Sequence, residues 1–511
     1  MRVMRPILLA AVWLCGFSIS FDRAAPAQEE LAQLYAEARR AEQAGDLASA
    51  VESYRRIVAL EPRMAEAYAN LGRLHFQLGQ FDQAETDLTR AIELKPALAG
   101  PYFFLGVLSF QRRQYPSALK QLKQSERLDP QNLLVHLYLG YAHSAARDFS
   151  DAVLQYEKAG ALAPTDQDVF YHLSKTYAQL AESYFERLHR SFPDSGYTSL
   201  AKAHVFEADH EWEAAKREYG RAAARLPNQK GLKERLAWVT ERAAGKDPGQ
   251  PVVPPDDDSA IGSLRFLYSP SSGDKTKEEI KAGQTRARVW RSRPGTTAEK
   301  CYALADGYKA LSFLAASWVA ESNPDSYRAH QLKGESYEAI GDVDQATREY
   351  ERASEVNPEL QGVRFAIGNL FWKKNDLEKA LPLLLGELKL NPNHAEALYE
   401  VGDIYLAQET PAKAREYFER SLESDPAIVE AHLALEKIAT AAGEHQTSIE
   451  HLFKAAALAP EDPTPHYRLS TLYKKLGRSD EARREMSLFM TLKARQDKVK
   501  ENSIEKKKRT K

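Results

Sequence analysis

Large apolar residues return along the chain at multiples of 34 residues, with small and polar residues in a fixed order between them. Tyr54, Leu88 and Tyr156 mark this rhythm in the first half, and Tyr350 and Phe418 mark it in the second. A period of about 20–50 residues is the signature of a stacked-repeat architecture. One helix pair cannot bury its apolar stripe alone, so neighbouring repeats are expected to stack.

Small residues and prolines keep the same phase as the apolar ones. Glycine and alanine are expected where a larger side chain would push two helices apart, at a cost of about 1–3 kcal/mol. Proline ends the second helix of a pair because it lacks an N–H. The prolines are Pro62, Pro96, Pro130, Pro164, Pro324, Pro358, Pro392, Pro426 and Pro460. The glycines, 24 residues before a proline, are Gly72, Gly106, Gly140, Gly334, Gly368 and Gly402, and the alanines, 12 before it, include Ala50, Ala84, Ala346 and Ala414.

Two segments show the whole repeat: Ala65–Pro96, AEAYANLGRLHFQLGQFDQAETDLTRAIELKP, and Ala395–Pro426, AEALYEVGDIYLAQETPAKAREYFERSLESDP. They resemble tetratricopeptide repeats, and the resemblance extends over roughly Leu31–Ala244 and Ala298–Arg495. It implies an all-α fold, an α-solenoid of helix-turn-helix repeats in two right-handed arrays with almost no strand. It implies little about function, because this family serves many unrelated pathways.

Breaks in the pattern define the expected domains. These are a signal peptide at 1–27, a first array at 28–245, a partly disordered linker at 246–297, a second array with a capping helix at 298–496, and a basic tail at 497–511. The linker is expected because Lys246–Asp258 is rich in proline and aspartate, and such a segment buries too little apolar area to offset its chain entropy.

The first array is expected to end irregularly. After Pro164 the next terminal proline, Pro193, comes 29 residues later, which predicts a shortened turn between the two helices of that repeat. The sequences that begin at Tyr171 and Tyr302 match at an offset of 131 residues. This indicates that one irregular helix pair is used twice.

The N-terminus has the pattern of an export signal. Arg2 and Arg5 precede an apolar stretch at 6–21, and Ala25-Pro26-Ala27 offers a cleavage site. The 16 residues of the stretch are fewer than the roughly 18 to 20 that span a bilayer. We therefore expect a periplasmic or secreted protein whose mature chain begins at Gln28. The alternative is an uncleaved leader that anchors the protein in the membrane.

Charge and composition exclude several functions. The chain has 70 Lys and Arg against 72 Asp and Glu, so no basic excess favours nucleic acid. Membrane contact is expected at most through an uncleaved leader or the basic tail. Beyond the leader Cys301 is the single cysteine, which excludes a thiolate metal cluster and suggests a small buried hydrophobe. Phosphate-binding glycine loops, H-E-x-x-H and C-x-x-C are missing. The sequence predicts no enzyme, no cofactor, and no catalytic or metal-binding residues.

In the tetratricopeptide family the first helices of successive repeats line a concave groove that binds peptide segments. The resemblance assigns to this groove Tyr35, Arg39, Arg73, Phe76, Phe103, Phe110 and Tyr141 in the first array, and Phe365, Asn369, Trp372, Tyr399, Asp403 and Tyr467 in the second. Aromatic residues and arginine are enriched at binding surfaces. The alternative is that the aromatic stripe packs inside the repeats.

Taken together, these features indicate a non-catalytic scaffold of the cell envelope or the secreted space that binds other proteins or peptide segments. The alternative is an accessory or regulatory subunit of an enzyme or a secretion complex, in which the partner carries the chemistry.

Overall fold

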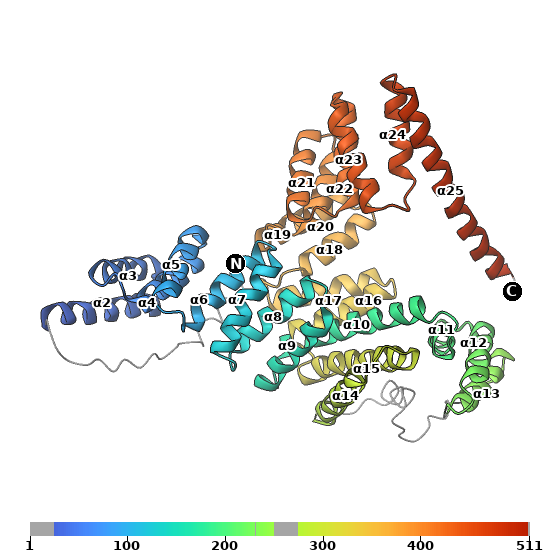
Figure 1. Ribbon diagram of the computed structural model, residues 1–511, viewed down its shortest axis with the longest axis horizontal. Coiled ribbons are helices and arrows are strands. Elements are labelled where there is room, and N and C mark those ends of the chain that lie inside the picture. Colours follow the sequence, from blue (N-terminus) through green and yellow to red (C-terminus); the bar gives the residue numbers. More distant parts are fainter. Residues whose placement is uncertain (1–24, 230, 250–273, 509–511) are drawn as a thin grey trace. The chain divides into compact units, whose positions relative to one another are not determined.

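The computed structural model describes residues 25–229, 231–249 and 274–508, and every regular element in these ranges is a helix (Figure 1). This confirms the predicted all-α class. Residues 1–24 of the expected signal peptide and 250–273 of the expected linker lie outside the described residues. Among the helices described, none has a stretch long and apolar enough to cross a membrane. The chain forms two compact units, which meet in sequence between Ser322 and Asn323.

The first unit begins with four helix pairs, α2 (Ala25–Gln43) with α3 (Leu47–Leu60), α4 (Ala65–Gln77) with α5 (Phe81–Leu94), α6 (Ala99–Gln111) with α7 (Tyr115–Leu128), and α8 (Leu133–Ala145) with α9 (Phe149–Leu162). It continues with α10 (Gln167–Ser191), α11 (Gly196–Ala208), α12 (Trp212–Arg225), α13 (Leu232–Ala243), α14 (Asp274–Ser292) and α15 (Ala298–Ser322). The second unit consists of α16 (Tyr327–Ala339), α17 (Val343–Val356), α18 (Val363–Lys373), α19 (Leu377–Leu390), α20 (Ala395–Ala407), α21 (Pro411–Ser424), α22 (Val429–Ala442), α23 (His445–Leu458), α24 (Thr464–Lys475) and α25 (Ser479–Lys508).

Six of the helix pairs have a close contact at a glycine. A Cβ atom on Gly402 of α20 would lie 2.8 Å from a ring carbon of Phe418 on α21 and 3.2 Å from the backbone oxygen of Ala414. Gly72 faces Leu88 in the same way, with the added atom 2.6 Å from the Leu88 side chain. The predicted reason for the glycines is confirmed, because a side chain at these positions would separate the two helices.

The turn between the two helices of a pair requires one residue with a left-handed backbone. Gly79 and Gly341 supply it with φ of 74° and 78°. At the same place in other repeats Arg113 and Glu409 have φ of 56° and 57°. Left-handed backbone costs a residue with a side chain about 1–2 kcal/mol, so packing of the flanking helices must enforce the turn there.

The repeat after Pro164 differs from the prediction. Instead of a pair with a shortened turn, α10 is one continuous helix of 25 residues. At the position where the other repeats have their left-handed residue, this repeat has Ala181, which is buried. Alanine favours helix, so the helix continues through this position.

The duplication is visible in the helix lengths. α10 and α15 both have 25 residues, α11 and α16 have 13, and α12 and α17 have 14. Each helix starts 131 residues after its counterpart, as in 298 − 167 for α15 and α10. Two irregular helix sets of the same register thus follow each other in the chain.

The boundary between the units corrects the expected domain division. The sequence pattern predicts a linker where α14 lies and the start of the second array where α15 lies, but both helices pack within the first unit. The Gln167 side-chain amide of α10 donates to the Val319 carbonyl of α15 at 3.1 Å, and the rings of Phe170 and Trp318 lie 4.2 Å apart. The reason is burial: apolar side chains of α15 can leave water only against α10 and its neighbours. Cys301 is 1% exposed there, as predicted for a small buried hydrophobe.

α14 is fixed to the first unit by polar contacts as well. Gln284 donates to the Tyr177 hydroxyl at 3.0 Å, and the Arg288 guanidinium pairs with Glu157 at 3.1 Å. The side chain of Glu157 is 3% exposed, so the arginine neutralises a buried carboxylate. A segment expected to be a linker therefore contributes a packed helix.

The glycine contact can be tested with two matched substitutions. We expect Gly402→Ala to lower the free energy of unfolding by about 1–3 kcal/mol, because the new methyl group meets Phe418 and backbone. Gly220 lies inside α12 with nothing within 4 Å of an added Cβ. Gly220→Ala should instead be neutral or stabilise by up to about 1 kcal/mol, because glycine is a poor helix former. Urea unfolding followed by circular dichroism distinguishes the two, and equal effects of both substitutions would contradict the contact.

Candidate functional site

The predicted groove residues lie on the first helices of successive repeats, and several of them join neighbouring first helices. Arg73 on α4 pairs with Glu42 on α2 at 2.5 Å. In the second unit Trp372 on α18 donates its indole N–H to Asp403 on α20 at 2.9 Å. Both pairs are 31 residues apart. This spacing is one repeat less about one helical turn, so the first-helix face of each unit carries a ladder of contacts between repeats.

The start of this face in the first unit is polar with one aromatic ring. The Tyr35 hydroxyl donates to the Met64 sulfur at 2.9 Å, and the Tyr35 ring meets Tyr54 edge-on at 5.8 Å. Burial, with the nearby Glu66 carboxylate, raises the pKa of Tyr35 to about 12. Arg39 is exposed. The two residues can thus offer a ring edge and a charge to a ligand.

Two of the predicted groove aromatics are packing residues instead. Phe76 is 4% exposed and lies 5.4 Å from the ring of Phe104, and Phe103 is 6% exposed and lies 5.2 Å from the same ring. These rings fill the space between repeats, where a ligand finds almost no side-chain surface. Phe76 and Phe103 are therefore removed from the candidate set.

Farther along the first unit the aromatic run reaches the surface. Phe110 and Tyr141 are half-buried, with ring centroids 6.4 Å apart. Tyr141 also meets His172 of α10 edge-on at 4.9 Å. The rings hold one another in place, so they are pre-organised for contact with an apolar side chain.

The second unit brings several of its predicted residues into contact. Tyr399 lies edge-on to Trp372 with ring centroids 6.2 Å apart, and the ring of Phe365 is tilted against that of His394 at 4.4 Å. Trp372, Tyr399 and Asp403 are all half-buried. Burial and the carboxylates nearby raise the pKa of Tyr399 to about 12. The result is an aromatic surface with an acceptor carboxylate at its edge.

Tyr467 lies separately from this group, on α24. It is 50% exposed, and its ring lies 5.2 Å from Phe489 of α25. It is the most open of the predicted aromatics and marks the C-terminal end of the same series of first helices.

One residue of this face was missed by the sequence reasoning. Glu400 is 3% exposed, it accepts a hydrogen bond from Asn369 at one oxygen, and its other oxygen has no partner in the described chain. Burial raises its pKa to about 7, which Asn369 and Lys373 offset only in part. The available signal was the spacing of 31 residues from Asn369, the same as between Trp372 and Asp403.

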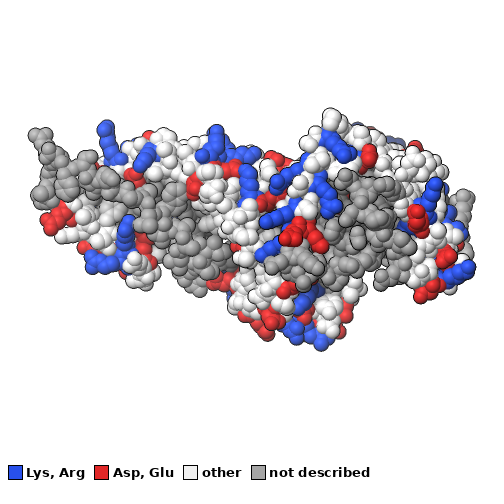
Figure 2. Space-filling view, turned by 90° about the horizontal axis from the view of Figure 1, so that it is seen from below, with Lys and Arg blue, Asp and Glu red and all other residues white. Residues whose placement is uncertain are grey.

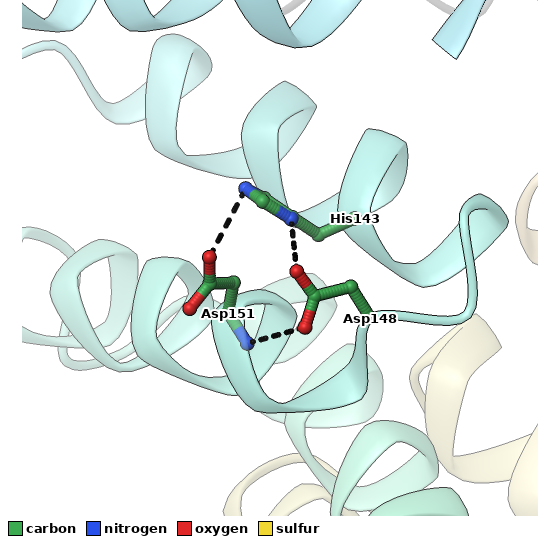
Figure 3. A group of neighbouring side chains, drawn as sticks. All are labelled: His143, Asp148 and Asp151. Carbon is green, nitrogen blue, oxygen red and sulfur yellow. Dashed lines mark hydrogen bonds and ion pairs between the residues drawn. The ribbon is translucent and has the colours of Figure 1, made fainter. Parts of the chain in front are cut away.

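A second missed group lies at the turn between α8 and α9. His143, Asp148 and Asp151 each offer a metal-ligating atom, and these atoms lie within 4.8 Å of one another (Figure 3). Burial lowers the pKa of His143, as does the nearby Lys123, while the two aspartates oppose the shift. The sequence reasoning assigned no metal ligands, because the three residues match no metal motif.

Figure 2 shows basic and acidic side chains interspersed over the face that it presents. This agrees with the formal net charge of −2 for the whole chain.

Comparison with known proteins identifies the class. Profiles described as tetratricopeptide repeat match residues 65–98, 105–167, 327–360, 365–427 and 408–463. Stacked helix pairs with a glycine contact define an α-solenoid repeat protein. The chain belongs to the tetratricopeptide-repeat family.

Individual relatives are distant. The chain is 20% identical over 183 residues to anaphase-promoting complex subunit 3 of Schizosaccharomyces pombe, which is 36% of this chain and 28% of that protein. Among solved structures, MamA from Desulfovibrio magneticus is 21% identical with a TM-score of 0.31, over 34% of this chain and 97% of that one. The Cut9–Hcn1 hetero-tetramer structure is 12% identical with a TM-score of 0.33, over 90% and 94%. The Naa15/Naa10 structure bound to HypK-THB is 12% identical with a TM-score of 0.38, over 93% and 97%.

The raised pKa of Glu400 predicts a specific pH dependence. The pKa of Glu400 is raised from its ordinary value of 4.5 to about 7, so the folded state binds the proton more tightly than the unfolded state. The protein therefore loses stability as pH rises from 4.5 to about 7, and loses no more above that. Glu400→Gln keeps an acceptor for Asn369 and cannot ionise. We expect this variant to be more stable than the wild type at pH 8, by up to about 3 kcal/mol, and nearly equal at pH 4.

Thermal unfolding of both proteins from pH 4 to pH 9 checks this expectation. If the two melting temperatures differ by the same amount at every pH, Glu400 ionises as easily in the folded chain as in the unfolded one.

Proposed function

We propose that this protein is a non-catalytic scaffold that binds segments of other polypeptides on the first-helix faces of its two units. Mediating protein–protein interaction is the general role of tetratricopeptide-repeat proteins. The observation that carries the proposal is the half-buried aromatic group of the second unit, Trp372 and Tyr399 with Asp403, held in one arrangement by contacts between repeats. Pre-ordered aromatic side chains bind at a small cost in entropy.

The two faces favour different segments. In the first unit the first-helix face begins with Tyr35 and Arg39 and continues, on later repeats, to the rings of Phe110 and Tyr141. This combination suits a segment with apolar anchors and acidic residues. In the second unit the aromatic group lies beside carboxylates, which suits an apolar side chain accompanied by a hydrogen-bond donor or a positive charge.

We expect Trp372→Ala to weaken binding about thirtyfold, which corresponds to about 2 kcal/mol for a central aromatic anchor. A photoreactive amino acid in place of the exposed Tyr467 first captures the bound polypeptide in cells, and mass spectrometry identifies it. The affinity of the purified pair is then measured by fluorescence polarisation.

Trp290→Ala is the matched control. Trp290 is also half-buried, but it lies on α14, which is not a first helix of a repeat pair, and the Arg293 guanidinium stands 3.6 Å from its ring centroid. It should leave affinity unchanged. Equal affinities of wild type and Trp372→Ala, or an equal loss in both variants, would place the binding surface elsewhere.

We also propose that the protein acts in the periplasm or outside the cell. The support is the leader pattern, with Arg2 and Arg5 before an apolar stretch and Ala25-Pro26-Ala27 after it. Cleavage before Gln28 would leave Leu34 and Ala38, the buried residues of α2, in place.

Fractionation of the source cells and N-terminal sequencing test the export proposal. We expect a mature chain that begins at Gln28 and is released from the envelope or medium without detergent. An intact Met1 on a cytosolic chain would refute it, and an intact Met1 in the membrane fraction would show the anchored alternative.

A further inference from the structure

The group at the turn between α8 and α9 carries an inference of its own. His143 lies in the last turn of α8, Asp148 is the residue that caps the N-terminus of α9, and Asp151 lies in the first turn of α9. Figure 3 shows the two carboxylates beside the imidazole ring, Asp148 near one ring nitrogen and Asp151 near the other. All three side chains therefore converge on one small space inside a single repeat.

The hydrogen bonds of His143 leave one nitrogen directed at a carboxylate. The side chain is 3% exposed, and Nδ1 lies 3.1 Å from Asp148 Oδ2, to which it donates. Nε2 has no hydrogen-bond partner in the described chain and lies 3.9 Å from Asp151 Oδ2. A nitrogen lone pair facing a carboxylate oxygen is repulsive unless a cation lies between them.

Other repeats show that the fold does not require this group. His75 occupies the same place two repeats earlier and is also buried with a partnerless Nε2. The counterparts of Asp148 and Asp151 there are Gln80 and Gln83, and the Nδ1 of His75 pairs instead with Asp87 at 2.7 Å.

The capping role of Asp148 is common to other repeats. Asp46, Asp342 and Asp376 cap their helices in the same way. Those repeats have Ala41, Tyr337 and Phe371 where His143 stands, and Ser49, Gln345 and Lys379 where Asp151 stands. The addition of a histidine and a second carboxylate to the cap is what sets this turn apart.

We propose that His143, Asp148 and Asp151 bind a divalent transition-metal ion such as Zn²⁺, with water completing the coordination. One imidazole nitrogen with two carboxylate oxygens suits zinc and its neighbours better than Ca²⁺ or Mg²⁺, which take oxygen ligands. The site joins the end of α8 to the start of α9. It is independent of the first-helix faces and of the binding proposed for them.

The geometry permits the ion after a small movement. Ligand atoms around zinc lie about 2.1 Å from the metal and hence about 3.3 Å apart, so atoms that are now within 4.8 Å of one another must approach further. Asp148 and Asp151 have side chains 47% and 52% exposed and can rotate, while the buried imidazole stays fixed. To reach an ion shared with Asp151, Asp148 exchanges its hydrogen bond from Nδ1 for coordination of the ion. Lys123 faces the same imidazole and opposes a cation, but two carboxylates outweigh its single charge.

Isothermal titration of Zn²⁺ into the full, chelator-treated chain tests the site. We expect one saturable equivalent and a rise in the melting temperature on addition of Zn²⁺. Asp151→Asn, an isosteric change at a half-exposed position, should weaken binding at least tenfold and abolish the rise. Mg²⁺ at the same concentrations should give neither effect.

Asp87→Asn is the matched control, because it alters the carboxylate beside His75 and should bind Zn²⁺ like the wild type. Absence of saturable binding would overturn the proposal. So would an Asp151→Asn variant that binds as tightly as the wild type, or an equal loss in Asp87→Asn.

Discussion

The close approach of two helices at a glycine is the contact on which the rest of the structure depends. Gly72, Gly106 and Gly140 in the first unit, like Gly334, Gly368 and Gly402 in the second, face a Leu, Tyr or Phe of the paired helix at a distance that excludes a Cβ atom. Because each pair is thin and its apolar faces are otherwise open, burial comes from stacking pairs on one another. The first helices then lie side by side and carry the ladder of contacts at 31-residue spacing.

This arrangement explains why the candidate binding residues are only half available. Side chains on the first-helix face both join neighbouring repeats and meet solvent. Phe76 and Phe103 are buried between repeats. Trp372 contacts both Tyr399 and Asp403, and all three remain partly exposed to solvent. Rigidity and accessibility thus come from the same contacts, which is what a surface that binds extended segments requires.

The long helices α10 and α15 interrupt the regular stack and make room for extra elements. Since α10 has no turn, its apolar side chains extend past one repeat and need a partner of equal length, which α15 provides. α14 packs beside these helices and is held by Gln284 to α10 and by Arg288 to α9. The same order and lengths of helices recur 131 residues later, so the long helix is a repeated structural unit of this chain and not an irregularity of one repeat.

The sequence by itself determined the repeat, because glycine, alanine, proline and the apolar positions act within one helix pair and their spacing is local. It also indicated the duplication at 131 residues. The assignment of the first helices as the binding face comes from the family resemblance and stays a prediction. Only the tertiary structure decided that Phe76 and Phe103 are interior, that α15 belongs to the first unit, and that Glu400 and the turn of His143 hold buried ionisable groups. The burial of these residues depends on how neighbouring helix pairs pack together. The 34-residue pattern describes contacts within one pair, so it does not show which side chains the next pair covers.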